Sequence, residues 1–70
     1  MHRAELEPGD VIKFGHRTVA IVETDGVTAI IRFANGDLGR TELPETTDRL
    51  GYAGEGIYAR LAPTHDPRKA

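Results

Sequence analysis

The chain contains no cysteine and no serine, and each absence excludes a class of site. Without cysteine, neither a disulfide framework nor a cysteine-ligated zinc site can support the fold. Serine and cysteine are also the ordinary nucleophiles of covalent catalysis, and neither is present. No apolar run reaches the roughly 18–20 residues of a membrane span, so we expect no membrane partner. No apolar stretch follows the charged residues 1–5, so we expect no secretory signal and a cytoplasmic protein.

The chain also lacks an excess of charge of either sign. Nine Lys and Arg stand against eleven Asp and Glu, a formal net charge of −2. This balance argues against a protein that coats DNA, although it allows a local basic patch. A chain of 70 residues buries only about 60% of its unfolded surface. We therefore expect oligomerisation or a partner to contribute to its stability.

Short runs rich in β-branched residues, separated by turn residues, predict an all-β domain. Asp25-Gly26 and Asn35-Gly36 lie between alternating apolar runs and are strong hairpin signals. The last three of the first four predicted strands therefore form an antiparallel meander. The four predicted strands cover residues 10–14, 17–23, 27–33 and 38–43.

The hairpin register follows from where the charged residues would point. With two-residue turns, Arg40 and Glu42 would face the core. With three-residue turns, Ile21 pairs with Ala29 and Ile31 with Gly39, and Gly26 and Gly36 adopt positive φ. The inner face is then Val19, Ile21, Val27, Ala29, Ile31, Phe33, Thr41 and Leu43. The outer face is Thr18, Ala20, Val22, Thr28, Ile30, Arg32, Leu38, Arg40 and Glu42.

The pattern changes after Leu43. Pro44 ends the fourth strand, residues 46–50 predict a single helical turn, and residues 57–61 alternate as a fifth strand. Residues 1–7 and 63–70 read as tails around one domain over 8–62. The most buried residues should be Ile12, Phe14, Val19, Ile21, Val27, Ala29, Ile31, Leu43, Ile57 and Leu61.

This strand order resembles that of SH3-like small barrels. The segments that carry the resemblance are Pro8 to Ile12, Val19 to Glu23, Ala29 to Phe33, and the turn Asn35-Gly36-Asp37, which look like Tudor- or KOW-type barrels. The resemblance implies a five-stranded barrel with a central three-strand meander and one helical turn before the last strand. It also implies a module that binds proteins, modified peptides or nucleic acid. We expect no cofactor.

The outer face of the meander is the candidate interaction surface. An apolar centre with an arginine-bearing rim has the composition of an interface. We expect a protein partner or a second copy to cover Ala20, Val22, Ile30, Leu38, Arg32 and Arg40. The alternative is a nucleic-acid surface, in which Arg17, Arg32 and Arg40 contact phosphates.

Enzyme chemistry finds little support in the sequence, and we expect neither a catalytic residue nor a metal site. Glu45 and Asp48 are three residues apart on the predicted helical turn, where carboxylates more often cap a helix start. His2, His16 and His65 show no metal-ligand spacing. A remaining alternative is a pore-forming oligomeric enzyme, because residues 56–59 loosely resemble a strand of the plasmid-borne dihydrofolate reductases.

Overall fold

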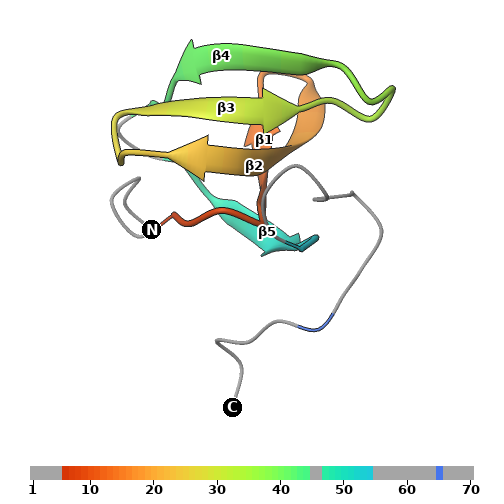
Figure 1. Ribbon diagram of the computed structural model, residues 1–70. Helices are drawn as coiled ribbons and strands as arrows, with labels where there is room; N and C mark the ends of the chain where they lie inside the picture. The colour runs from red at the N-terminus through yellow and green to blue at the C-terminus, as the bar shows by residue number, and fades with distance from the viewer. Residues whose placement is uncertain (1–5, 45–46, 55–64, 66–70) are drawn as a thin grey trace.

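Five antiparallel strands form one open sheet in the computed structural model, which describes residues 6–44, 47–54 and 65. The described residues contain no helix. The sheet order is β4-β3-β2-β1-β5. In Figure 1, β2, β3 and β4 lie as one layer, β1 crosses behind them, and β5 lies below. The strands are β1 (Asp10–Phe14), β2 (Arg17–Thr24), β3 (Thr28–Arg32), β4 (Leu38–Glu42) and β5 (Arg49–Tyr52).

The β3–β4 hairpin has the predicted register. Ile31 pairs with Gly39 and Ala29 with Thr41. The Phe33 amide donates to the Asp37 carbonyl at 2.8 Å, so three residues, 34–36, make the loop. Gly36 occupies the left-handed region at φ 94°, as the bulged three-residue turn requires.

The β2–β3 hairpin departs from the predicted register. Ile21 pairs with Ile31 instead of Ala29, and Thr24 pairs with Ala29. The Thr24 hydroxyl donates to the Thr28 carbonyl and the Asp25 carboxylate accepts from the Val27 amide, and these bonds hold a longer loop. A β-bulge at Val22 shifts the register again. Gly26 has the predicted positive φ, 95°. The shift at Ile21 is two residues, so Val19 and Ile21 still face the core.

The core lies inside the bend of the sheet. Leu43, directly after β4, packs in the same cluster as Ile12 of β1, although two strands, β3 and β2, lie between β4 and β1 in the sheet. Contact between these two strands requires the sheet to fold over on itself. Phe14 and Phe33 pack against the cluster and stay partly exposed, so the prediction that Phe14 is among the most buried residues is wrong. Its buried members are Leu6, Ile12, Val19, Ile21, Ala29, Ile31 and Leu43.

Several burial predictions need correction. Val27 is 52% exposed, because it lies in the β2–β3 loop and not in a strand. Ala20 and Val22 were expected on the outer face, but both are buried. Ala20 belongs to a second apolar cluster with Val11 and Ala53. The predicted core residues Ile57 and Leu61 lie outside the described residues.

A strand stands where a helical turn was predicted. Residues 49–52 form β5, which pairs with β1 in the register Val11 to Gly51. Within the described residues, β4 and β5 form the two outer edges, and the sheet does not close into a barrel. The predicted fifth strand over residues 57–61 lies outside the described residues.

Gly9 joins three strands at one point. Its amide donates to the Ile21 carbonyl at 2.7 Å, and its carbonyl accepts from the Ala53 amide at 2.7 Å. Its φ is +95°, and a Cβ there would collide with the Gly54 carbonyl and lie 2.5 Å from Tyr52 Cε1. Only glycine suits this position, where the segment before β1 comes close to the segment at the end of β5.

Truncating Ile31 to alanine should lower the free energy of unfolding by about 2–5 kcal/mol. Ile31 is 1% exposed and packs at the centre of the core cluster, so the lost side chain leaves a cavity. Urea unfolding followed by circular dichroism measures the change. A variant that unfolds at the same urea concentration as the parent would contradict this placement of the core.

Candidate functional site

The outward side of β3 and β4, which we call the β3–β4 face, combines apolar and charged side chains. Cross-strand pairing sets Ile30 opposite Arg40 and Arg32 opposite Leu38. Because successive residues of a strand point to opposite sides, these four lie on the side away from buried Ala29 and Ile31. The face consists of Thr28, Ile30, Arg32, Leu38, Arg40 and Glu42.

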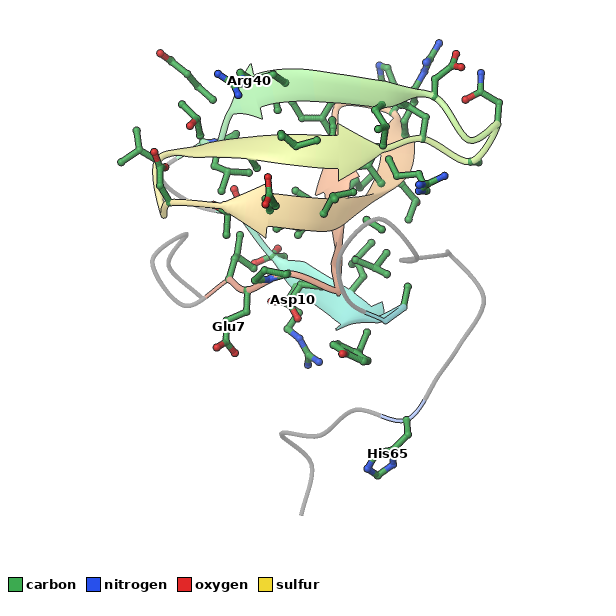
Figure 2. All side chains as sticks on the ribbon, viewed as in Figure 1. Glu7, Asp10, Arg40 and His65 are labelled. Carbon is green, nitrogen blue, oxygen red and sulfur yellow. The ribbon has the colours of Figure 1, made fainter. Side chains whose placement is uncertain are left out.

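Exposure on this face rises from β3 to β4. Ile30 and Arg32 are partly buried, whereas Leu38 is 53% exposed. Arg40 and Glu42 are exposed as well, and Figure 2 shows Arg40 on β4, the uppermost strand. Directly opposed side chains on antiparallel strands lie within contact distance. The arrangement therefore presents two apolar side chains, each beside an arginine.

A groove of about 340 Å³ opens at one end of the β3–β4 face. Ile30 and Arg40 line it from the face, and the β2–β3 loop supplies its other wall. Glu23 and Asp25 bring carboxylates to the same groove. The groove therefore has mixed charge, which suits polar contacts of either sign at its rim. It is lined by Glu23, Thr24, Asp25, Thr28, Ala29, Ile30 and Arg40.

Asp25 organises the loop that borders this groove. Its Oδ1 accepts hydrogen bonds from the amides of Val27 at 2.9 Å and Thr28 at 2.8 Å. The Thr24 hydroxyl adds a bond to the Thr28 carbonyl at 2.8 Å and accepts from the Gly26 amide at 3.0 Å. The Thr28 and Val27 amides favour the ionised carboxylate and hold the pKa of Asp25 below its usual range.

Four of the six predicted partner-contact residues lie on the β3–β4 face: Ile30, Arg32, Leu38 and Arg40. The other two, Ala20 and Val22, are buried within the chain and are not accessible to a partner. Strand alternation alone placed them on the outer face. The second apolar cluster, which buries Ala20, and the bulge at Val22 left no signal in that alternation.

The three arginines of the nucleic-acid alternative do not share one face. Arg17 lies two residues before core residue Val19 in β2 and therefore on the same side of that strand. Its guanidinium lies 5.5 Å from the centroid of the Phe33 ring, a cation–π contact. Arg32 and Arg40 lie on the β3–β4 face instead. Arg32 Nη1 also donates to the Gly36 carbonyl at 3.4 Å. A second groove, of about 400 Å³, is lined by Arg17, Thr18, Phe33, Ala34 and Asn35.

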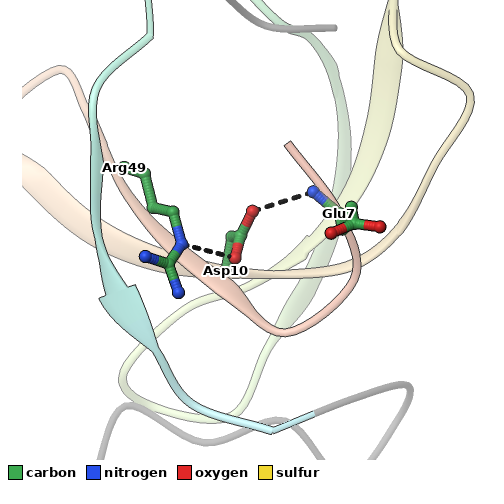
Figure 3. A network of polar contacts seen from close by, with 3 residues as sticks. All are labelled: Glu7, Asp10 and Arg49. Carbon is green, nitrogen blue, oxygen red and sulfur yellow. Dashed lines mark hydrogen bonds and ion pairs between the residues drawn. The ribbon is translucent and has the colours of Figure 1, made fainter. Parts of the chain in front are cut away.

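A buried ion pair connects β1 with β5 (Figure 3). Arg49 Nε lies 2.8 Å from Asp10 Oδ1, and the Asp10 side chain is fully buried. The other oxygen, Oδ2, accepts from the Glu7 amide at 2.8 Å. Sequence reasoning missed this pair, although a carboxylate at the start of an apolar strand was a visible signal. Its contacts join three chain segments, so we assign it a structural role.

The described residues offer little else for chemistry. Within residues 6–44, 47–54 and 65, no three His, Asp or Glu side chains gather closely enough to hold a metal ion. The same part of the chain contains no helix that is long and apolar enough to cross a membrane. His16 and His65 are exposed. His2, Glu45 and the segment 56–59 lie outside the described residues.

Comparison with known proteins does not add a function. No family model matches the chain, and no curated protein or solved structure shows significant similarity to it.

Replacing Arg49 with methionine should lower the free energy of unfolding by about 3–5 kcal/mol, because it leaves the Asp10 carboxylate buried without its cation. Urea unfolding measures the loss. Adding Asp10→Asn to the Arg49 variant should recover part of it, since the remaining group is then neutral. Equal stability of Arg49→Met and the parent would show that the pair does not hold β5.

Replacing Asp25 with asparagine should make stability less dependent on pH in the acid range. Because the folded-state pKa of Asp25 lies below its ordinary value of 3.8, the parent is stabilised above that value and loses the contribution as pH falls through the folded pKa. Asparagine keeps an acceptor oxygen for the Val27 and Thr28 amides but does not titrate there. Urea midpoints between about pH 2 and 6 test this; parallel curves for parent and variant would contradict it.

Proposed function

We propose that this chain is a non-enzymatic binding module whose β3–β4 face contacts a protein partner. The observation that carries the proposal is the pairing of Ile30 with Arg40 and of Leu38 with Arg32. Apolar centres with arginine at the rim are typical of protein interfaces. An exposed leucine, 53% accessible and next to partly buried Ile30, gives a partner apolar area to bury.

The charges around the face favour a protein over a nucleic acid. Glu42 pairs with Thr28 on the face, and Glu23 and Asp25 line the groove beside Arg40. These carboxylates weaken the attraction of Arg40 for phosphate, and binding to nucleic acid depends on several phosphate contacts. The partner surface that fits best is an apolar side chain flanked by carboxylates, which pair with the two arginines.

The SH3-like fold belongs to the same proposal. The antiparallel meander of β2, β3 and β4 and the pairing of β5 with β1 support it. Modules of this class commonly bind extended peptides or nucleic acid, so we expect a short linear segment as the partner.

Replacing Leu38 with aspartate should weaken peptide binding at least tenfold while the chain stays folded. The probe is a set of peptides selected from a random displayed library on the parent chain, then synthesised and labelled for fluorescence anisotropy. We expect an apolar residue with neighbouring Asp or Glu to recur among them. The loss follows because aspartate removes apolar contact area and repels the carboxylates of the peptide.

Leu50→Asp is the matched control. Leu50 is 56% exposed, close to Leu38, but lies in β5 at the opposite edge of the sheet. It should leave peptide affinity within about twofold of the parent. Equal effects of the two substitutions would overturn the proposed face. If DNA or RNA oligonucleotides bind instead, with affinity that falls steeply with salt and is lost in Arg32→Ala and Arg40→Ala, the nucleic-acid alternative replaces it.

A further inference from the structure

β4 is an edge strand whose outer backbone groups can be identified residue by residue. The Leu43 amide donates to the Val27 carbonyl at 2.8 Å, and the Asp37 carbonyl accepts from the Phe33 amide at 2.8 Å. Alternate residues of an antiparallel strand direct their N–H and C=O groups to opposite sides. Residues 37, 39, 41 and 43 therefore point toward β3, and Leu38, Arg40 and Glu42 point toward the outer edge.

Within the described residues, β4 pairs with β3 alone, and no other described strand occupies its outer edge. The Thr41 hydroxyl donates a hydrogen bond of 3.3 Å to the Glu42 carbonyl, which keeps a second lone pair for a further donor. An unpaired edge with backbone donors and acceptors is a template for another strand. An added strand must satisfy both the backbone groups and the side chains of Leu38, Arg40 and Glu42.

A second copy of β4 can satisfy both if it lies antiparallel across a two-fold axis. Three registers bring the outward residues of the two copies together. An axis at Arg40 opposes two arginines, which is unfavourable. An axis at Gly39 sets Leu38 of each copy against Arg40 of the other. Glu42 then has no residue of the other β4 strand opposite it. An axis at Thr41 sets Arg40 of each copy against Glu42 of the other.

We propose that the chain forms a homodimer in which two β4 strands pair antiparallel about an axis through Thr41. The sequence Arg40-Thr41-Glu42 is complementary to itself in this arrangement. Each Arg40–Glu42 pair exchanges two backbone hydrogen bonds and places opposite charges side by side. The two Thr41 side chains meet on the other side of the sheet, and Pro44, which has no amide hydrogen, ends the ladder.

The dimer extends the sheet across the axis and leaves the outward side of β3 uncovered. The two proposals share Arg40 on β4, but formation of the dimer requires no peptide. A chain of 70 residues gains stability from an added interface. The two ideas fail separately, because dimerisation is measured without any peptide present.

A single cysteine at position 41 tests the geometry directly. The parent has no cysteine, so Thr41→Cys introduces the sole thiol of the chain. The two 41 positions form a non-hydrogen-bonded pair, whose Cα atoms lie about 4.5 Å apart, within disulfide range. Mild oxidation should yield a covalent dimer. Thr18→Cys, at an exposed position of β2, is the control and should cross-link much less.

Charge exchange tests the register. Arg40→Glu should set glutamates against each other across the axis, and Glu42→Arg should set arginines against each other. Each should raise the dimer dissociation constant about tenfold or more. The double variant, Arg40→Glu with Glu42→Arg, restores opposite charges and should recover most of the parent affinity. Analytical ultracentrifugation over a concentration series measures all four proteins.

Three results would overturn the proposal. The first is a parent chain that remains monomeric at millimolar concentration. The second is a dimer that neither single charge variant weakens. The third is a Thr41→Cys variant that cross-links no faster than Thr18→Cys.

Discussion

The buried contact between Asp10 and Arg49 is the interaction on which the arrangement of the sheet depends. Asp10 begins β1 and Arg49 begins β5, and the Asp10 carboxylate also accepts a hydrogen bond from the Glu7 amide. A fully buried carboxylate is costly unless it is paired and hydrogen-bonded. The three segments must therefore come together in one geometry, with Gly9 between β2 and the residues after β5. The ion pair fixes β5 against β1, and the bend of the sheet that brings Leu43 to Ile12 encloses the core.

The outer face follows from that bend. Where β2 turns toward β1, side chains on both sides of the strand are buried, from Val19 to Val22. Beyond the bulge at Val22, one side of the sheet is accessible, and Ile30, Leu38 and their arginine neighbours lie there. The arginine-flanked apolar side chains therefore lie on β3 and β4, whereas exposed Leu50 lies on β5 at the other edge of the described sheet. That location places the proposed peptide face and the proposed dimer edge on the same strand, β4.

Strand alternation and turn residues were sufficient to predict the four leading strands, the β3–β4 register and the positive φ of Gly26 and Gly36. They were insufficient where side chains competed with the backbone. Asp25 and Thr24 bind loop amides, which lengthened the β2–β3 loop and exposed Val27. Arg49 reaches Asp10 across 39 residues, and no local pattern reports such a contact. This pairing accompanies a strand at residues 49–52, where capping residues had predicted a helical turn.

The distance along the chain between Asp10 and Arg49 also has a kinetic consequence. The β2–β3 and β3–β4 hairpins close short loops, whereas β5 can dock on β1 only after about forty residues have been brought together. Local contacts form before distant ones because less chain entropy is lost. The meander should therefore assemble first and β5 last, and β5 should also be the first strand to detach during native fluctuations. Amides of β5 would then exchange with solvent faster than those of β3, although both belong to the same sheet.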